Sequence, residues 1–543
     1  MANSSSTLLI DNPLDHEQPD LLGINDYQEA LIECLKTSDM PITIALQGEW
    51  GSGKTSLMNN LKYHLCQDQD NKTAPFYCVC INAWQFSLSS TSSIQITIDI
   101  LKSVIIQIGN IKKANGDLVD KAMDTLKIIK AVFLPITKVV AEETAGLASK
   151  TFLDSSEFGK NIEKVVVNSI VEQFKNKDPL IIQLKDNIEK LINQIISGEN
   201  NEASNLDKKG FIFFIDDLDR IDPVLSVKIL ELFKNIFNIE KCIFLLAIDY
   251  DIIVQGLKPM FGELTSENEA KFNLYFDKLI QLSISMPVQN YNIKIFLRDL
   301  LLKSKFFDKS ELDDNKLLQE IVHYAQLSIG NNPRLLKRLI NSLSVINHII
   351  TIKLNHSEQN NDIYINEEKL EYDSSWWSFQ KSKTLIFALT CIQIAFPQIY
   401  NILSVAPNFI AWDKSLAEDL EISITESTIP PAIQDEWHIT SDWEIILYKF
   451  CLQKNFSFMQ TYNIISIFKT IEALVDRDTH VGIGKISFFM QLTDITCRRK
   501  SSVVYVKRPQ YAFITKKIAA MQIASTLISD KISKLSDNDD QHS

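Results

Sequence analysis

Short apolar runs alternate with helical patterns over the first half of the chain. Five runs are rich in β-branched and aromatic residues and cover residues 42–47, 77–82, 211–215, 242–248 and 281–286. Most of them are continuously apolar, which indicates strands that are covered on both faces. Strands that alternate with helices predict an α/β fold with a parallel sheet.

The second and third runs are separated by more than 120 residues. Apolar residues in this interval recur at spacings of four, three and four, as at Leu184, Ile188, Leu191 and Ile195, which predicts amphipathic helices. We therefore expect a helical insertion at 87–206. Its apolar faces either pack against one another or form an arm that binds a partner, and the pattern is compatible with both.

One uncharged stretch, residues 384–412, is long enough to span a bilayer. Pro397 lies near its centre, however, and would break a single helix there. Gln393, Gln398 and Asn401 also interrupt the apolar pattern. We therefore expect two buried helices joined at the proline and no stable membrane span.

Composition and charge narrow the class of protein. The chain has 543 residues, too many for one core, and is 45% hydrophobic and 23% charged, as expected for a soluble globular protein. Its net charge of −13 argues against a protein that binds nucleic acid mainly through a basic surface. The eight cysteines form no CxxC pair, and the N-terminus has no signal-peptide pattern. We therefore expect free thiols and a cytoplasmic location.

The segment "GEWGSGKTS", residues 48–56, follows the first predicted strand and matches the pattern GxxxxGK[ST]. Its glycines allow a tight turn whose N–H groups can cradle phosphate oxygens, and the following helix adds its positive N-terminus. Lys54 is expected to contact the β- and γ-phosphates, and the Thr55 hydroxyl to coordinate Mg²⁺. The predicted nucleotide-binding residues are Gly48, Trp50, Gly51, Ser52, Gly53, Lys54, Thr55 and Ser56.

Two consecutive acids follow the third predicted strand, in the segment "IDDLDRID" at 215–222. A P-loop needs a carboxylate at the tip of a neighbouring strand to hold Mg²⁺ and its waters, and Asp216 has that position. Asp217 is expected to be the catalytic carboxylate that orients the attacking water. Because the strand at 77–82 lies between the two motifs, we expect the strand order 5-1-4-3-2 of additional-strand P-loop NTPases, with the ligand at the carboxyl ends of the strands.

Other charged and aromatic residues near these motifs each have more than one expected partner. Arg220 is expected to pair with Asp219 or to reach a neighbouring subunit as an arginine finger. Asp249 follows the fourth strand, where we expect it to pair with a Mg²⁺-bound water or a basic residue. Trp50 and Trp84 are expected either to pack together in the core or to contact the ligand.

The motifs together resemble the KAP family of P-loop NTPases. The similar segments are "DLLGI" (20–24), "NAWQF" (82–86), "IDDLDRIDP" (215–223), "LLAIDYDII" (245–253) and "GNNPRLLKRLIN" (330–341), and the match covers roughly residues 10–400. The resemblance implies binding and hydrolysis of ATP with Mg²⁺. It also implies a role in prokaryotic anti-phage defence, such as that of the ATPase subunit of Qat-type systems. Arg334 would be a catalytic sensor of the γ-phosphate, and the alternative is a solvated charge on an exposed helix.

The predicted organisation follows from these assignments. It comprises an N-terminal tail at 1–19, a P-loop NTPase core at 20–290 that includes the insertion, a helical lid at 291–354, a mixed, mainly helical C-terminal domain at 370–530 and a disordered tail at 531–543. A polar stretch at 355–369 marks the boundary between the lid and the C-terminal domain. A strand is expected at 502–506.

The main hypothesis is an ATP-driven switch subunit of a multi-subunit complex, with self-association also open. Because aspartate is shorter than the glutamate of many fast ATPases, we expect Asp217 to support slow, partner-stimulated turnover. One alternative is a nucleotide-bound scaffold with negligible hydrolysis. Another is a nucleic-acid-stimulated ATPase, for which the basic segment 497–517 offers a surface. The residues themselves do not distinguish adenine from guanine, since Ile24 stands where related NTPases often have arginine.

Overall fold

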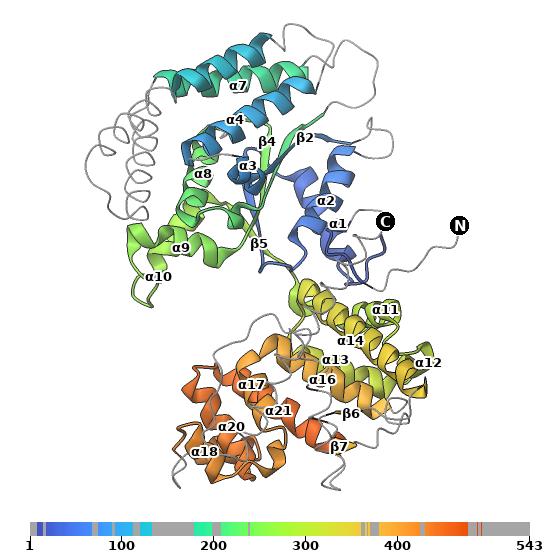
Figure 1. Cartoon of the computed structure of the whole chain (residues 1–543). Coiled ribbons are helices and arrows are strands. Elements are labelled where there is room, and N and C mark those ends of the chain that lie inside the picture. The colour runs from blue at the N-terminus through green and yellow to red at the C-terminus, as the bar shows by residue number, and fades with distance from the viewer. Residues whose placement is uncertain are drawn as a thin grey trace, which may run out of the picture. The chain divides into compact units, whose positions relative to one another are not determined.

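A computed structural model describes two compact units of the chain (Figure 1). The sheet unit is Asn12–Tyr291, and the helical unit is Met1–Asp11 together with Asn292–Ser543. The described residues are 8–14, 18–67, 74–89, 93–111, 120–132, 179–197, 208–236, 239–359, 364–365, 368–369, 380–423, 429–475, 486 and 490. The basic segment 497–517, the strand expected at 502–506 and the tail at 531–543 lie outside them.

A five-stranded parallel sheet forms the centre of the sheet unit. Its strands are β1 (Ile42–Gln47), β2 (Phe76–Asn82), β3 (Gly210–Asp216), β4 (Cys242–Ile248) and β5 (Leu282–Ser285). They lie in the order β2-β3-β4-β1-β5, so the predicted α/β fold and strand order are confirmed. The central strands β3 and β4 are buried almost throughout, as expected for strands covered on both faces, whereas the edge strand β5 is largely exposed.

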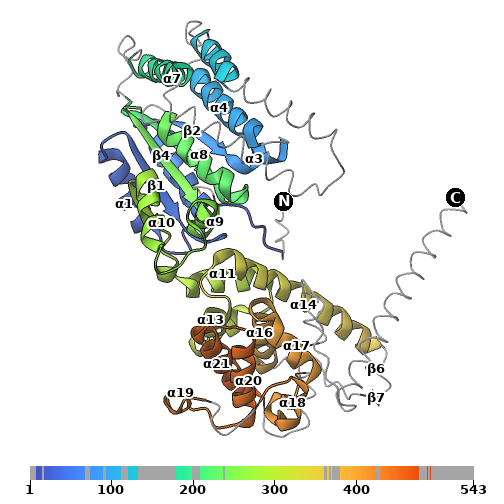
Figure 2. The same ribbon diagram turned by 90° about the vertical axis from the view of Figure 1, so that its left-hand side faces the viewer.

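Helices cover both faces of this sheet. The helices α1 and α2 lie on one face, and α3, α4 and α8 lie on the other (Figures 1 and 2). The helices of the unit are α1 (Asn25–Thr37), α2 (Lys54–Lys62), α3 (Ala83–Ser89), α4 (Ser93–Asn110), one over residues 120–132, α7 (Pro179–Ser197), α8 (Pro223–Ile236), α9 (Tyr250–Phe261) and α10 (Glu269–Leu279). A π-helical turn, Tyr63–Gln67, extends α2, and short 3₁₀ turns cover Leu218–Arg220 and Val288–Asn290.

The described part of the predicted insertion consists of helices, as expected. The apolar positions Leu184, Ile188, Leu191 and Ile195 of α7 are fully buried, as are Ile100, Leu101, Val104, Ile105 and Ile108 of α4. Both helices contribute to the same hydrophobic core as the sheet. Their apolar faces are therefore covered by the sheet unit itself, as in the self-packed alternative.

The helical unit contains a series of packed helices. They are α11 (Ile293–Ser304), α12 (Lys309–Leu312), α13 (Asn315–Ser328), α14 (Pro333–Gln359), α16 (Gln380–Ala395), α17 (Pro397–Val405), α18 (Lys414–Asp419), α19 (Pro431–Glu436), α20 (Asp442–Gln453) and α21 (Phe458–Leu474), with a 3₁₀ turn at Phe409–Ala411 and a small hairpin of β6 (Tyr364–Ile365) and β7 (Glu368–Lys369). The helix α14 continues to Gln359, into the stretch predicted as a polar break. That stretch contains no proline or glycine before residue 360, so nothing in it stops a helix.

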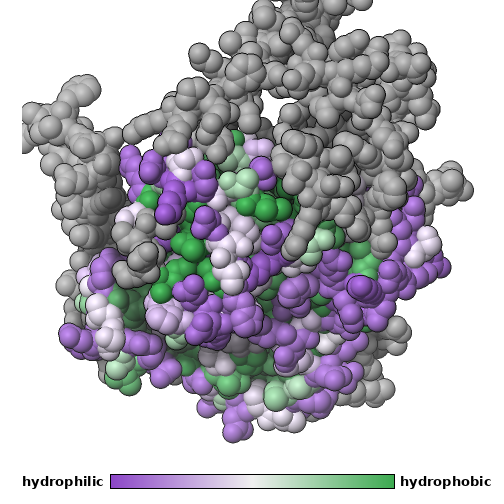
Figure 3. Space-filling model, turned by 90° about the horizontal axis from the view of Figure 1, so that it is seen from below, coloured by the Kyte–Doolittle hydropathy of each residue, from purple (hydrophilic) through white to green (hydrophobic). Residues whose placement is uncertain are grey.

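The uncharged stretch at 384–412 forms two helices, as predicted. α16 ends at Ala395, and α17 begins with Pro397 as its first residue. A proline fits this position, because the N–H that it lacks would have no partner within the helix. Most of the apolar side chains of these two helices are buried. Figure 3 shows one face of the molecule, on which hydrophilic residues surround small hydrophobic areas. Within the described residues, no helix is both long and apolar enough to cross a membrane.

Candidate functional site

The loop between β1 and α2 is shaped by its glycines and held by residues that follow β5. Gly53 has a φ of +107°, in the left-handed region that glycine adopts without steric cost. A Cβ at Gly48 would lie 2.7 Å from Ser52 Oγ and 2.9 Å from Met286 Cγ, so a side chain has no room there. The Tyr291 hydroxyl donates a hydrogen bond of 2.7 Å to the Ser52 carbonyl. The loop is therefore held in a tight turn in which a larger residue at Gly48 or Gly53 would be strained.

Lys54 begins α2 and directs its ammonium group back over this loop. Its Nζ donates a hydrogen bond of 2.6 Å to the Gly48 carbonyl and lies 3.3 Å from Asp219 Oδ2. Both the Lys54 and the Asp219 side chains are only 8% exposed, so water screens their charges weakly. A phosphate that binds Lys54 would have to replace these two partners.

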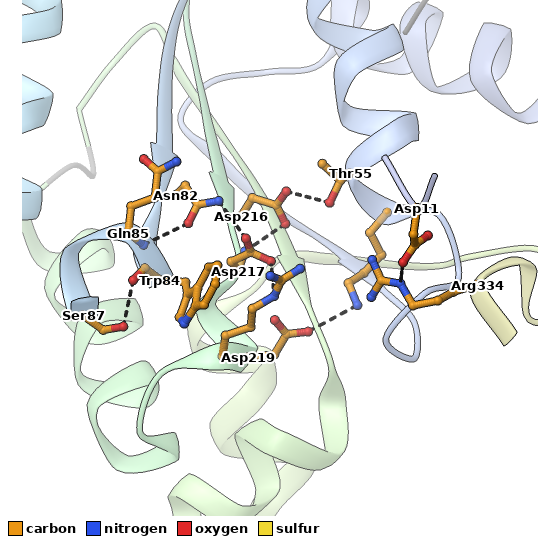
Figure 4. Close-up of polar contacts among 12 residues, drawn as sticks. Asp11, Thr55, Asn82, Trp84, Gln85, Ser87, Asp216, Asp217, Asp219 and Arg334 are labelled. Atoms are coloured by element: carbon orange, nitrogen blue, oxygen red, sulfur yellow. Dashed lines mark hydrogen bonds and ion pairs between the residues drawn. The ribbon is translucent and has the colours of Figure 1, made fainter. Parts of the chain in front are cut away.

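Thr55 and Asp216 connect the loop to the end of β3 (Figure 4). The Thr55 hydroxyl donates a hydrogen bond of 2.7 Å to Asp216 Oδ2. Burial raises the pKa of the Asp216 carboxyl; the Thr55 hydrogen bond opposes this shift, whereas the negative charges of Asp217 and Asp219 add to it. A cation bound beside Asp216 would relieve this concentration of negative charge.

Asp217 lies in a left-handed backbone conformation, with a φ of 58°, which is uncommon for a residue with a side chain. Its carboxylate has a partner at each oxygen: Asn82 Nδ2 donates to Oδ2 at 2.7 Å, and Arg220 Nε lies 2.7 Å from Oδ1. Asn82 ends β2 and lies beside Asp216 in the sheet. Two neighbouring strands and the turn after β3 therefore position the Asp217 carboxylate.

The expected ion pair between Arg220 and Asp219 is wrong. Arg220 pairs with Asp217, because residues three apart lie on the same side of the 3₁₀ turn Leu218–Arg220. Asp219 consequently points away from Arg220, toward Lys54. The alternative role of Arg220, as a finger in a neighbouring subunit, stays a prediction.

Trp50 and Trp84 do not pack together in the core, so that alternative is wrong. Their side chains are 62% and 37% exposed, respectively. The Arg220 guanidinium carbon lies 5.5 Å from the ring centroid of Trp50 and 5.1 Å from that of Trp84, both within the range of cation–π contacts. Both tryptophan rings therefore contact the same guanidinium group, that of Arg220.

Three further predicted residues have local structural roles. Asp249 caps the N-terminus of α9, where its carboxylate accepts a hydrogen bond of 3.2 Å from the Asp251 N–H. Burial raises the pKa of Asp249, and the Lys54 charge opposes this shift. Ser56 Oγ accepts a hydrogen bond of 3.0 Å from the Leu14 N–H. Ile24 is buried and its N–H donates to Asp20, whose carboxylate accepts four N–H groups of the "DLLGI" loop and its next residue.

Arg334 belongs to the helical unit, at the start of α14 after Pro333. Its N–H donates to Asn332 Oδ1 at 3.1 Å, which caps the helix. Its guanidinium forms an ion pair with Asp11 of the same unit. The guanidinium is thus held by a carboxylate, and its contact with a γ-phosphate stays a prediction.

The sequence profile of the KAP family P-loop domain matches residues 24–350. The chain belongs to the KAP family. This match covers more than half of the chain, and it includes the sheet unit's P-loop and acidic strand end and the helical unit as far as α14. Comparison with curated proteins gives no significant match. The family assignment identifies a P-loop NTPase domain, a class that binds nucleotides.

The described residues of this KAP protein fit a nucleotide and a divalent cation. Ser52 Oγ is buried in the loop and has no hydrogen-bond partner among the described residues. A phosphate oxygen would satisfy it, as it would the ammonium group of Lys54. Thr55 and Asp216 together supply the hydroxyl and carboxylate oxygens that Mg²⁺ prefers.

Two residues of the site, Asn82 and Tyr291, had no assigned role in the sequence, and a third, Asp219, was assigned the wrong partner. Asn82 holds Asp217, Tyr291 holds the loop, and Asp219 pairs with Lys54. Asn82 could have been found, because a polar residue at the carboxyl end of a strand that neighbours β3 must lie near the acids. Tyr291 gave no local signal, since its contact joins residues 239 positions apart.

Proposed function

We propose that this KAP protein is a Mg²⁺-dependent ATPase that acts as a nucleotide-driven switch. The observation that carries the proposal is the 2.7 Å hydrogen bond between the Thr55 hydroxyl and Asp216, which brings the phosphate loop and the acidic strand end into one site. A P-loop alone would support binding. The adjacent second acid, Asp217, supports hydrolysis as well.

Each residue would have a defined task in this reaction. Lys54 would leave Asp219 and bind the β- and γ-phosphates, while the loop N–H groups hold phosphate oxygens. Thr55 and Asp216 would hold Mg²⁺, which supplies charge neutralisation at the phosphates when bound. Asp217 would accept a hydrogen bond from the attacking water and orient it toward the γ-phosphate. Arg334 would contact the γ-phosphate and report its loss to the helical unit.

Slow basal turnover is part of the proposal. Each oxygen of Asp217 already has one partner, which leaves fewer of the acceptor positions of this carboxylate to a water. Such a restrained site suits a switch that is stimulated by a partner, and we propose that the partners are the other subunits of a cytoplasmic anti-phage defence complex, as in Qat-type systems. The preference for adenine and the defence role both derive from similarity to the KAP family.

The test compares ATP hydrolysis and ATP binding in the same preparations. Wild type should release phosphate in the presence of Mg²⁺, and Asp217→Asn should lower kcat by about a hundredfold or more with little change in the Kd for ATP. Lys54→Ala should abolish binding. Asp222→Asn is the matched control, because it removes the same charge from the same loop and retains an oxygen to accept from the Leu225 N–H.

Two outcomes would contradict the proposal. Equal kcat values for wild type and Asp217→Asn would remove Asp217 from catalysis. Tight ATP binding without hydrolysis in wild type would instead favour the nucleotide-bound scaffold. Adding DNA or RNA to the assay tests the nucleic-acid-stimulated alternative, in which kcat would rise with the polymer.

A further inference from the structure

Arg220 is held between two aromatic rings and also contacts the predicted catalytic carboxylate. Its Nε lies 2.7 Å from Asp217 Oδ1, and its guanidinium carbon lies 5.1 and 5.5 Å from the Trp84 and Trp50 ring centroids. The side chain of Arg220 is 28% exposed and that of Asp217 is 11% exposed. The pair is thus partly shielded from water, which strengthens the attraction between the two charges.

This arrangement affects the lone pairs that Asp217 can offer to a water molecule. A carboxylate that orients a nucleophilic water must present an oxygen to it within hydrogen-bond distance. In this structure Asn82 is bonded to Oδ2 and Arg220 is paired with Oδ1. Removal of Arg220 would leave Oδ1 with an open side, while Asn82 would still fix the orientation of the carboxylate.

The two tryptophans come from the segments that border the site. Trp50 lies inside the phosphate loop, between Gly48 and Gly51, and Trp84 lies in α3, two residues after Asn82. A change in the phosphate loop therefore moves one of the two rings that hold Arg220. The Trp50 ring is also 62% exposed, so its outer side can be contacted from solvent.

We propose that Arg220 is a positioning residue that restrains Asp217 in the resting enzyme, and that Trp50 and Trp84 hold Arg220 in this restraining position. Hydrolysis then requires Arg220 to leave Asp217 Oδ1. This inference rests on the proposed ATPase function and adds to it the residue that limits the basal rate. It also differs from the arginine-finger role, in which Arg220 would act on the nucleotide of a neighbouring subunit and promote hydrolysis.

The decisive variant is Arg220→Ala, measured at full length by steady-state ATP hydrolysis. We expect kcat to rise by about five- to thirtyfold, the factor that corresponds to two cation–π contacts of about 0.5–1 kcal/mol each, while the KM for ATP is unchanged. Trp84→Ala should also raise kcat, and Trp84→Phe, which retains an aromatic face, should raise it less. Lys258→Ala is the control, since Lys258 pairs with Glu263 far from Asp217 in the sequence and should leave kcat unchanged.

A double-variant cycle separates this restraint from a general loosening of the fold. Arg220→Ala combined with Trp84→Ala should give no more activity than Arg220→Ala alone, because both act through the same contact. Arg220→Ala combined with Asp217→Asn should have the low activity of Asp217→Asn. Additive gains, or a gain that survives Asp217→Asn, would overturn the proposal.

The outcome also distinguishes a failure of this inference from a failure of the proposed function. If Asp217→Asn abolishes hydrolysis but Arg220→Ala lowers kcat or leaves it unchanged, Arg220 does not restrain Asp217 and the ATPase proposal stands. If Asp217→Asn has no effect on kcat, the proposed role of Asp217 in ATP hydrolysis is wrong, and a restraint by Arg220 has nothing to act on. Melting temperatures of all variants show whether any change in kcat reflects partial unfolding.

Discussion

Asp219 should oppose nucleotide binding, because it pairs with Lys54, the lysine that we propose binds the phosphates. Lys54 Nζ lies 3.3 Å from Asp219 Oδ2, and both side chains are 8% exposed. Replacing Asp219 by asparagine removes the negative charge and keeps an oxygen that can accept from Nζ. We expect Asp219→Asn to bind nucleotide more tightly than wild type and to be less stable without nucleotide.

The size of the effect follows from the distance between the two charges. Unit charges 3.3 Å apart attract by about 5 kcal/mol at an effective dielectric constant of about 20. This is a ceiling, because both charges lose hydration when they are buried and the asparagine retains a neutral hydrogen bond. A net change of about 1–2 kcal/mol is expected, which lowers the Kd for nucleotide about five- to thirtyfold.

Calorimetric titration with ADP in the absence of Mg²⁺ measures this effect without hydrolysis or a metal. The melting temperature gives an independent reading, because a ligand that binds only the folded state raises it. For Asp219→Asn we expect a lower melting temperature without nucleotide and a larger increase when ADP is added. Asp222→Asn, which removes a charge that has no contact with Lys54, should match wild type in both measurements.

Asp219 does not oppose nucleotide binding if Asp219→Asn binds ADP as weakly as wild type, or more weakly. Weaker binding would mean that Asp219 contributes to the nucleotide site, for example by keeping Lys54 in the position that the phosphates need. An unchanged Kd with a lower melting temperature would mean that the ion pair persists when nucleotide is bound.

Two other substitutions test the packing and electrostatics of the sheet unit. Because the pKa of Asp216 is raised in the folded protein, its ionisation destabilises the fold above that pKa, and the effect disappears as the pH falls below 3.8, where Asp216 is protonated in both states. Asp216→Asn should therefore raise the melting temperature of the nucleotide-free protein at pH 7, and by progressively less in scans at lower pH; an equal gain at every pH would contradict this. Gly256→Ala should lower the free energy of unfolding by about 1–3 kcal/mol, and with it the melting temperature. The new Cβ would lie 2.1 Å from the Pro223 carbonyl oxygen and force α8 and α9 apart. The exposed neighbour Gln255, changed to alanine, should have almost no effect, and equal melting temperatures for the two variants would refute the steric argument.

Features set by local patterns could be predicted from the sequence. The strands at 42–47 and 242–248 have the predicted bounds, because each is an apolar run with polar residues or a break at both ends. The shape of the phosphate loop follows from its glycines. The position of the Asp216 carboxylate beside this loop follows from its place at the end of a buried strand. In each case the deciding information lies within about ten residues of the site, which is the range over which strand and turn preferences act.

The partners of charged side chains could not be predicted in the same way. Arg220 has four acids within five residues, and only the 3₁₀ turn decides that Asp217 is its partner. Lys54 and Asp219 are 165 positions apart, so their contact depends on the order of the strands. The continuation of α14 to Gln359 shows a related limit, because polar residues are compatible with both a helix and a loop when no glycine or proline intervenes.

Asp216→Asn and Asp219→Asn remove the same charge from positions three residues apart, yet they should change stability in opposite directions. Asp216 has two carboxylates as its charged neighbours, so its own charge is unfavourable until a cation binds. Asp219 has Lys54 as its partner, so its charge is favourable until a phosphate binds. A nucleotide bound with Mg²⁺ would supply both missing charges at once, the cation beside Asp216 and the anion beside Lys54. In the proposed reaction, metal and phosphate would therefore each remove an electrostatic cost to the binding of the other, and nucleotide affinity should depend more strongly on Mg²⁺ in wild type than in Asp216→Asn.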